Sequence, residues 1–437
     1  MKAATFERGI HPKDHKSLTA QKPIEYARLP QRVIIPMAQH IGAPAKAEVS
    51  IGDTVKNGQI IGTPQGFVST NIHTSMSGKV VAIGPFPHPS GRYVETVVIE
   101  SDGKDEALAF EEHDDYTRLD KEQIRKIIRN AGIVGLGGAA FPSDIKLTPP
   151  AEKPIDVAII NGAECEPYLT ADHRLMLEQP DKIVAGLKII MHVLGVNKGY
   201  IGIENNKPDA IASMERVVAG ESSLKVFTLQ VKYPQGAEKM LIKATTGREV
   251  PNRGGLPMDI GVVVHNAGTA MAIYEAVRFG KPLIERVVTV SGRGIRKPKN
   301  LMVRIGAPVS HLIEQCGGLT EKAVKIIMGG PMMGFALATT EVPVLKGTSG
   351  ILALEEGEFA HTDTFYPCIR CGRCVDICPM GLMPNLLSVF AEKGHYEDAK
   401  AYNLFDCFEC GSCAYVCPSK RPIVHLVRLA KSMTKPG

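Results

Sequence analysis

Two cysteine runs near the C-terminal end decide the architecture of this chain: 368-CIRCGRCVDICP-379 and 407-CFECGSCAYVCP-418. Each has the spacing C-x2-C-x2-C-x3-C-P, in which three closely spaced thiolates can wrap one four-iron, four-sulfur cluster. The fourth cysteine of each run is expected to bind the cluster of the other run. Zinc also binds CxxC pairs, but it does not account for two identical four-cysteine runs. The spacing therefore predicts a C-terminal domain with two [4Fe-4S] clusters.

The crossed pattern divides the eight cysteines into two sets. The first set is Cys368, Cys371, Cys374 and Cys417, and the second is Cys407, Cys410, Cys413 and Cys378. Two further cysteines, Cys165 and Cys316, stand apart and are interpreted as small buried residues. Because the N-terminus has no apolar leader, metal binding is favoured over disulfides, and a cytoplasmic setting is expected.

The composition is that of an ordinary globular protein. The 437 residues are 44% hydrophobic and 22% charged, and a chain of this length is expected to form about three domains or more. No apolar run approaches the ~18 residues that span a bilayer, and the net charge of +5 does not indicate nucleic-acid binding. Residues 1–32 and 407–437 each carry a balance of +4. These basic ends could meet an acidic partner or a lipid surface, or they could be solvated tails.

The N-terminal part of the chain predicts a small all-β domain at 31–101, preceded by an irregular tail at 1–30. Short β-prone runs alternate there with turns. The stretches 52-GDTVKNGQIIG-62 and 73-HTSMSGKV-80 resemble the barrel-sandwich fold of lipoyl and biotinyl carriers. Those carriers modify a lysine at a hairpin tip, whereas the turn here has none. The resemblance therefore implies the fold and not the carrier chemistry.

The rest of the chain predicts a multidomain α/β protein. Residues 120–283 alternate strand-like and helix-like runs, which favours an α/β domain with a mainly parallel sheet; one long helix is expected at 173–194. Residues 284–345 resemble the β-grasp module that binds soluble ligands. Residues 360–437 form the expected two-cluster, ferredoxin-like helical domain.

Four loops of the α/β domain are candidates for a ligand site. The glycine-rich stretch 135-GLGGAAFP-142 precedes three loops at predicted strand ends, at 161–167, 233–238 and 264–269. Convergent loops at the carboxyl ends of strands are where open α/β sheets bind ligands. A lone glycine-rich loop is weak evidence, and its glycines could simply be turn residues.

Together these segments resemble the flavoprotein subunit of respiratory complex I and, more closely, the RnfC family of the Rnf/Rsx ion-translocating ferredoxin:NAD oxidoreductases. The resemblance covers nearly the whole chain. It implies noncovalent FMN, NAD(H) as substrate, and hydride exchange between them without a catalytic side chain. It also implies a peripheral subunit at the cytoplasmic face of the cell membrane, with membrane subunits of the same complex as partners, ferredoxin reached indirectly through that complex, and no nucleic acid.

The same resemblance assigns flavin contacts to the glycine-rich loop and to polar residues of the other loops. These residues are Gly135, Gly137, Gly138, Lys146, Asn161, Glu164, Asn266 and Thr269. The glycines allow backbone contact, Lys146 meets the ribityl-phosphate end, and Thr269 lies near the phosphate. Phe141 is expected near the nicotinamide or adenine of NADH, with Glu166 and Glu238 at its ribose or nicotinamide. Glu166 could instead be a helix-entry carboxylate.

Three rival functions compete with this one. The first is a soluble NADH dehydrogenase or hydrogenase flavin subunit, which the carrier-like head disfavours. The second is a cobalamin- or ligand-binding module, which does not explain the eight cysteines. The third is an electron-carrying scaffold without nucleotide binding. The complex I pattern has Arg, Asp and Ser where this chain has Leu136, Ala163 and Cys165, so no flavin contact is expected from these three side chains.

Overall fold

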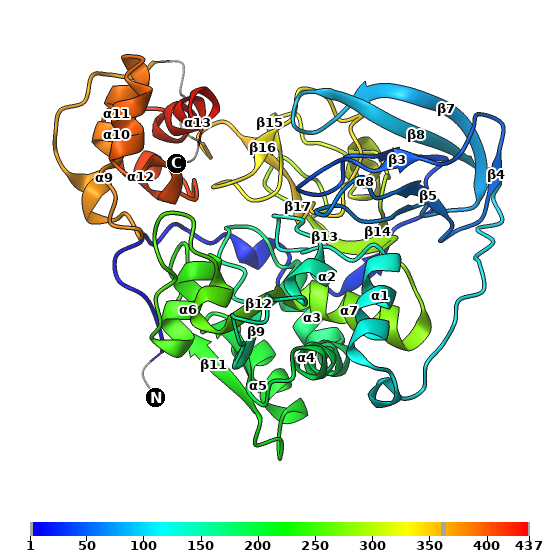
Figure 1. The fold of residues 1–437 in the computed structure, drawn as a ribbon. Coiled ribbons are helices and arrows are strands. Elements are labelled where there is room, and N and C mark those ends of the chain that lie inside the picture. The colour runs from blue at the N-terminus through cyan, green and yellow to red at the C-terminus, as the bar shows by residue number, and fades with distance from the viewer. Residues whose placement is uncertain (1–2, 360–363, 436–437) are drawn as a thin grey trace.

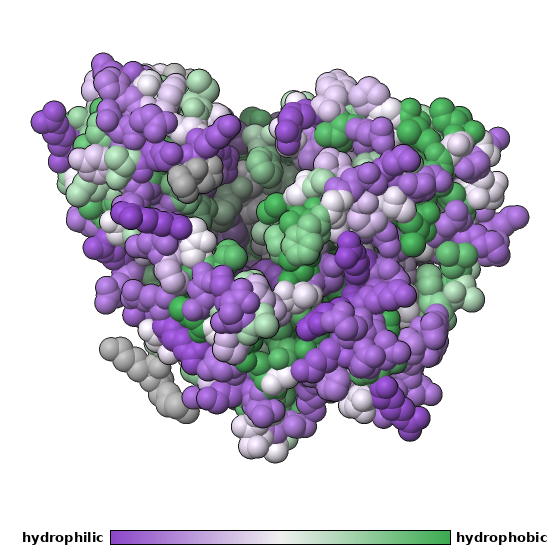
Figure 2. All heavy atoms as spheres, viewed as in Figure 1, coloured by the Kyte–Doolittle hydropathy of each residue, from purple (hydrophilic) through white to green (hydrophobic). Residues whose placement is uncertain are grey.

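The computed structural model describes residues 3–359 and 364–435. Residues 1–2, 360–363 and 436–437 belong to the predicted ranges 1–30 and 360–437 but lie outside the described residues. Figure 1 shows a β-rich head and a mixed sheet above a helix-rich α/β domain, with the C-terminal helices standing to one side. The surface is hollowed between those helices and the mixed sheet (Figure 2). In the described ranges, no helix is long and apolar enough to cross a membrane.

The head consists of two small antiparallel sheets that pack around one core, as the alternation of the sequence predicts. One sheet has the order β2 (Arg32–Pro36), β8 (Tyr93–Ser101), β7 (Gly78–Pro87), β4 (Thr54–Val55). The other has the order β3 (Lys46–Ala47), β5 (Ile60–Thr63), β6 (Ile72–His73). Val33, Ile61 and Ile99 are fully buried between them. The turn at 73–78 is also buried, and Ser75 Oγ donates to the Ile305 carbonyl at 2.5 Å. This turn is therefore an interface between domains.

The α/β domain is built on a fully parallel sheet, in agreement with the predicted mainly parallel one. Its order is β11 (Leu224–Leu229), β10 (Gly199–Glu204), β9 (Val157–Gly162), β12 (Val262–Asn266). One face is covered by α1 (Lys121–Asn130), α3 (Ala171–Glu178), α4 (Pro180–Leu194), α5 (Pro208–Val217) and α7 (Ala267–Phe279). The other face is covered by α6 (Glu238–Thr246). The helix α2 (Ser143–Lys146) follows the glycine-rich loop.

The single helix predicted at 173–194 is wrong, because the structure has two helices there. The first, α3, ends at Glu178, and Pro180 begins α4. Proline lacks the backbone N–H that a helix interior requires, but it is well suited to the first position of a new helix. The break allows α3 to leave the direction of α4 and to bring its N-terminus to the end of β9.

The mixed sheet has the order β1 (Ile24–Tyr26), β14 (Lys299–Arg304), β13 (Glu285–Ser291), β17 (Gly350–Glu355), β15 (Ala323–Met328), β16 (Phe335–Ala336). The helix α8 (Val309–Gln315) shares its core. Two strands lie outside the range 284–345 predicted for this module: β17 is central, and β1 comes from the N-terminal segment. Their pairing partners are distant in sequence, so no local pattern reveals them.

The segment 3–30, here called the N-terminal strap, is built into the fold rather than left as a solvated tail. Ala4 bridges Leu229, Ile10 bridges Tyr233, and the Gly9 N–H donates to the Ile377 carbonyl at 3.1 Å. Its Lys16 begins a short 3-10 helix, Lys16–Leu18, and is only 6% exposed. The strap therefore connects the α/β domain, the C-terminal domain and the mixed sheet.

The C-terminal domain is helical: α9 (Arg373–Asp376), α10 (Pro384–Glu392), α11 (Tyr396–Ala401), α12 (Ser412–Tyr415) and α13 (Ile423–Met433). Its core includes Leu387, Leu404 and Val427. The basic end of the chain is folded into this domain and is not a free tail. Arg428 and Lys431 bind Glu409 at 2.7 and 2.8 Å, and Arg421 binds Glu392 at 2.6 Å.

Candidate functional site

The glycine-rich loop is a closed turn that rests on α7. The Gly135 N–H donates to the Phe141 carbonyl at 2.9 Å, and the Leu136 N–H donates to Thr269 Oγ1 at 2.8 Å. A Cβ at Gly137 would lie 3.4 Å from that of Asn266. At Gly138, where φ is +106°, a Cβ would meet nothing within 4 Å. The backbone at Gly138 is therefore open to a flat ligand, which fits the flavin contact expected there.

The two asparagines predicted to contact flavin are neighbours in the parallel sheet. Asn161 at the end of β9 pairs in register with Asn266 at the end of β12. Asn266 Oδ1 accepts from the N–H groups of Gly268 and Thr269 at 2.9 and 3.3 Å, which caps α7. Asn161 Nδ2 donates to the Gly236 carbonyl at 2.8 Å. The structure thus brings together all four loops that the sequence analysis selected.

A buried carboxyl lies beside this pair. Asn266 Nδ2 donates to Asp172 Oδ2 at 2.6 Å, and burial, with a further contribution from the Glu164 charge, raises the pKa of Asp172 to about 7. Asp172 is not among the residues that the sequence predicts for the site. It is the second residue of a predicted loop-to-helix junction, and its acid identity alone gives no signal of burial.

Lys146 and Glu238 face each other at this edge of the sheet. Lys146 Nζ lies 2.7 Å from Glu238 Oε1, and it also donates to the Val264 carbonyl at 3.1 Å. Both side chains remain about one-third exposed. An accessible cation at the end of α2 fits the expected contact with a phosphate, and the ion pair joins two residues that are predicted to serve different ligands.

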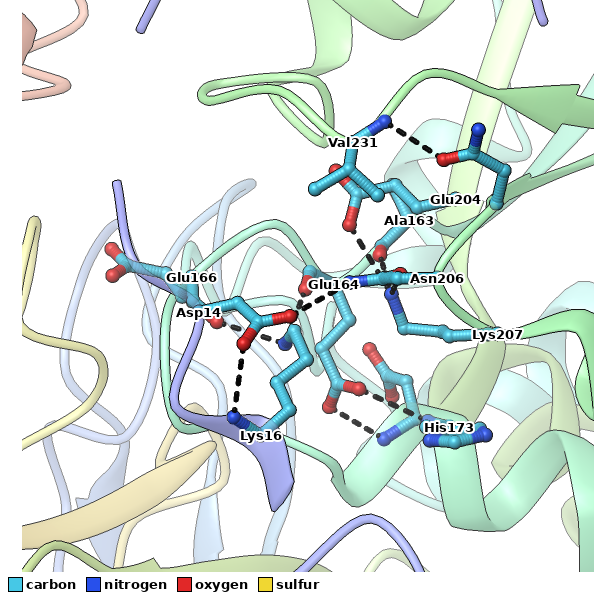
Figure 3. Close-up of polar contacts among 12 residues, drawn as sticks. Asp14, Lys16, Ala163, Glu164, Glu166, His173, Glu204, Asn206, Lys207 and Val231 are labelled. Atoms are coloured by element: carbon cyan, nitrogen blue, oxygen red, sulfur yellow. Dashed lines mark hydrogen bonds and ion pairs between the residues drawn. The ribbon is translucent and has the colours of Figure 1, made fainter. Parts of the chain in front are cut away.

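The loop 163–169 is held by two buried lysines that the sequence analysis missed (Figure 3). Lys16 Nζ donates to the carbonyls of Glu164, Glu166 and Leu169 at 2.8, 3.0 and 2.5 Å. Lys207 Nζ donates to the Ala163 carbonyl at 2.7 Å and to Glu204 at 3.2 Å. Burial lowers the pKa of Lys16 and raises the pKa of Glu204.

The two glutamates of this loop point in different directions (Figure 3). Glu164 accepts from the N–H groups of Asp172 and His173 at 2.8 and 3.1 Å, so it is the carboxylate at the entry to α3. Glu166 accepts from the N–H groups of Met332 and Met333 at 3.0 and 2.9 Å, and burial raises its pKa to about 7. The structure therefore places Glu166 against the mixed-sheet loop rather than beside Glu238. The helix-entry position suggested for Glu166 belongs to Glu164.

The cysteines gather in the crossed arrangement. One pocket is lined by Cys368, Cys371, Cys374 and Cys417, which are the predicted first set. In the second set, burial raises the pKa of Cys407 to about 11, and the nearby Cys378 thiol acts in the same direction. Cys410 and Cys413 likewise have Cys378 as an electrostatic neighbour. Over the described residues, no three His, Cys, Asp or Glu side chains converge closely enough for a single metal ion. Cys316 is fully buried in the mixed-sheet core, as interpreted.

The second cysteine run lies directly against the loops of the α/β domain. Tyr233, 1% exposed, donates its hydroxyl to the Cys410 carbonyl at 2.7 Å. Cys165 and Met332 pack against the same cluster. Arg8 of the strap donates to the Cys378 carbonyl at 3.4 Å. The loop 233–236 thus contacts Asn161 at one end and Cys410 at the other. The sequence analysis selected this loop but not Tyr233.

An open glycine-rich loop, an asparagine pair at a parallel-sheet edge and two four-cysteine sets define a flavin and iron–sulfur electron-transfer protein. Family models agree domain by domain: the RnfC barrel sandwich hybrid domain matches residues 4–104, the Nuo51 FMN-binding domain 128–275, the SLBB domain 287–336, and the 4Fe-4S dicluster domain 367–420. The residues that the structure gathers therefore fall within an FMN-binding domain and a two-cluster domain.

Curated relatives match over nearly the full chain. The RnfC-type subunit of the proton-translocating ferredoxin:NAD(+) oxidoreductase complex of Clostridium ljungdahlii is 54% identical, over 98% of this chain and 93% of that protein. Its counterpart in the Na(+)-translocating ferredoxin:NAD(+) oxidoreductase complex of Acetobacterium woodii is 49% identical, over 99% and 97%. This chain belongs to the RnfC family of the Rnf-type ion-translocating oxidoreductases, which confirms the resemblance.

A solved structure shares the fold at low identity. A chain of an NAD+-reducing [NiFe]-hydrogenase in the H2-reduced state has a TM-score of 0.50 and 17% identity. The match covers 74% of this chain and 64% of that chain. At this identity the likeness concerns the fold alone.

Proposed function

We propose that this chain passes electrons between NAD(H), noncovalent FMN and two [4Fe-4S] clusters, as a peripheral subunit at the cytoplasmic face of a membrane-bound ferredoxin:NAD oxidoreductase that translocates ions. Its partners would be the membrane subunits of that complex, with ferredoxin reached through them. One observation carries the proposal: the loop 233–236 bonds both Asn161 of the flavin-binding edge and Cys410 of the second cysteine run. The names of the relatives support the reaction class.

Bound flavin would supply the conversion between two-electron hydride chemistry and one-electron chemistry. The role of this chain is then to bind and orient. Gly135, Gly137 and Gly138 would allow close backbone approach, with Asn161, Glu164 and Asn266 ordering the loops around the ring system. Lys146 and Thr269 would hold the phosphate end. No side chain needs to act as an acid, a base or a nucleophile.

The cysteine assignment is part of the proposal. Cys368, Cys371, Cys374 and Cys417 would hold the first cluster, and Cys407, Cys410, Cys413 and Cys378 the second. The contacts of Tyr233 with Cys410 and of Arg8 with Cys378 support the second cluster as the one nearer the flavin. We also propose a β-grasp fold for the mixed sheet with α8 and a ferredoxin-like fold for the C-terminal helices, within domains near the expected boundaries.

Anaerobic purification with iron, sulfide and flavin assays tests this function. We expect about eight iron atoms and one releasable FMN per chain, because two four-iron clusters and one flavin site are proposed. NADH should then bleach the flavin absorbance. About four iron atoms, or bound zinc, would contradict the ligand assignment. A flavin that NADH does not bleach would favour the electron-carrying scaffold.

The Glu238→Gln variant is expected to weaken NADH binding more than FMN binding. The change removes a charged acceptor worth ~1.5–3 kcal/mol, or about 10- to 150-fold in Kd. It also frees Lys146 from its ion pair, so contact with the FMN phosphate is not lost. Titration of flavin absorbance with NADH and of flavin fluorescence with FMN measures the two constants. Equal losses in both would refute this division of the site. The sequence predicts the same behaviour for Glu166→Gln, but the contacts of Glu166 with Met332 and Met333 predict a smaller effect on NADH.

The Tyr233→Phe variant should loosen the contact between the second cysteine run and the flavin loops. It leaves the buried Cys410 carbonyl without this donor, at a cost of ~1–3 kcal/mol. We expect faster hydrogen exchange at residues 407–413, unchanged iron content, and slower cluster reduction by NADH. The control is Tyr415→Phe, since Tyr415 is 56% exposed in the same domain. Identical exchange in both variants would count against the Tyr233 contact.

A further inference from the structure

The two cysteine runs form an internal repeat whose copies adopt the same backbone conformation. Arg370 and Glu409 occupy equivalent positions, with φ of +56° and +62°. Gly372 and Gly411 follow with φ of +77° and +82°, and each loop then enters a four-residue helix, α9 or α12. Because the local folds match, a difference in their surroundings reflects what each loop contacts.

The second loop is closed off from solvent. Cys410, Gly411 and Ser412 are buried, and a Cβ at Gly411 would lie 2.9 Å from the Met332 carbonyl. The only charged residue of this loop, Glu409, is neutralised by Arg428 and Lys431 of the same domain. Nothing in this loop is left for another protein.

The first loop is open, apolar at its centre and basic at its edge. Ile369 is 66% exposed and Tyr366 59%, and Cys371 is exposed as well. Arg370 and Arg373 are exposed, and among the described residues neither guanidinium has an ion-pair partner. In Figure 1, α9 lies on the outer side of the domain, whereas α12 lies toward the body of the molecule.

The charges beside this loop are mostly positive. Lys420, exposed, follows Cys417 of the first set, and its strand of chain is joined to the loop by the Tyr366 N–H, which donates to the Ser419 carbonyl at 2.9 Å. Asp376 is the one acidic residue within 364–381. The basic residues of α13, in contrast, are paired inside the domain. The free positive charge of this domain is therefore concentrated where the first cysteine set reaches the surface.

We propose that the segment 366–373 is the docking contact for another redox protein of the complex, one that presents acidic residues around a one-electron centre. This rests on the proposed function, because the first cluster must be the exit for electrons. An apolar centre with a polar rim is the usual anatomy of a protein interface, and electron-transfer encounters need only a small one. Each transfer would oxidise the first cluster by one electron and reduce the partner's centre by one, with no bond made or broken.

The test is charge reversal in the assembled complex, in native membranes, with Arg370→Glu and Arg373→Glu combined. The matched control is Lys393→Glu with Lys400→Glu on the α10–α11 side of the same domain. NADH reduction of flavin and clusters in the isolated holo-chain should be the same in both. At low salt, onward reduction of the membrane-bound cofactors should fall about tenfold in the arginine variant and less than twofold in the control, because opposite charges steer the encounter. Added salt should slow the unmodified complex and not the variant.

Three other outcomes would overturn parts of this picture, and they are distinguishable. Equal onward rates in the two variants would overturn the docking site alone. A loss of binding to phosphatidylglycerol vesicles, with onward rates unchanged, would make the segment a lipid contact instead. Failure of NADH to reduce the unmodified holo-chain would overturn the proposed function, and the docking site with it.

Discussion

Replacing Cys410 with alanine is expected to halve the bound iron, from about eight to about four atoms per chain, because one four-iron cluster loses a ligand. FMN should stay bound, since its site is formed by the α/β domain. The larger effect is on electron flow. The second cysteine set lies against the flavin loops through Tyr233, so NADH should no longer reduce the remaining cluster. Iron and flavin assays with EPR spectroscopy of the NADH-treated protein measure all three.

The matched variant is Cys371→Ala, the equivalent position of the first run. It should also lose about four iron atoms, but the remaining second cluster should still be reduced by NADH. An EPR signal from the surviving cluster in both variants, or in neither, would contradict the order in which the two clusters are placed.

The Lys346→Met variant is expected to change how stability depends on pH. Lys346 is 1% exposed at the junction of three domains. Its Nζ donates to the carbonyls of Asn71 and Gly132 at 3.0 and 2.7 Å. Burial lowers its pKa to about 7 from the usual 10.5, and His73 and His40 nearby have lowered pKa values too.

The sign follows from proton linkage. Between pH 7 and 10 the unfolded chain holds a proton at Lys346 that the folded chain has released, so stability rises with pH over this window. Each unit is worth at most ~1.4 kcal/mol. The stability of the unmodified chain relative to Lys346→Met should therefore grow by up to ~3 kcal/mol from pH 7 to 9, and change little below pH 7.

Scanning calorimetry of both proteins at pH 6, 7, 8 and 9 tests this. The control is Lys22→Met, which removes an exposed lysine that donates to the Pro298 carbonyl and should show no such trend. A constant difference between unmodified and Lys346→Met proteins across this range would mean that the buried amine stays protonated.

The features that sequence could predict are those written in local patterns. The cysteine spacing, the alternation of the head and the parallel sheet each recur over a few residues, and the structure has them. The loops at 135–142, 161–167 and 265–269 could be selected together because strand ends in a parallel sheet share one edge.

The features that sequence could not predict depend on distant partners. The strand β17 pairs with β13 and β15, and the strap strand β1 pairs with β14. Lys16, Lys207 and Lys346 are buried on backbone carbonyls, yet lysine in a local pattern indicates a surface position. The place of Glu166 was missed for the same reason, because the amide groups it binds belong to Met332 and Met333.

The N-terminal strap has a consequence for synthesis. The first residues to leave the ribosome pair with some of the later ones: Ala4 with Leu229, Ile24 with Asn300, and Gly9 with Ile377. Contacts of such long sequence separation form slowly and late, and domains made earlier can fold before them. The strap is therefore expected to close last, over domains already formed, and a bulky N-terminal fusion would delay this final step more than any other.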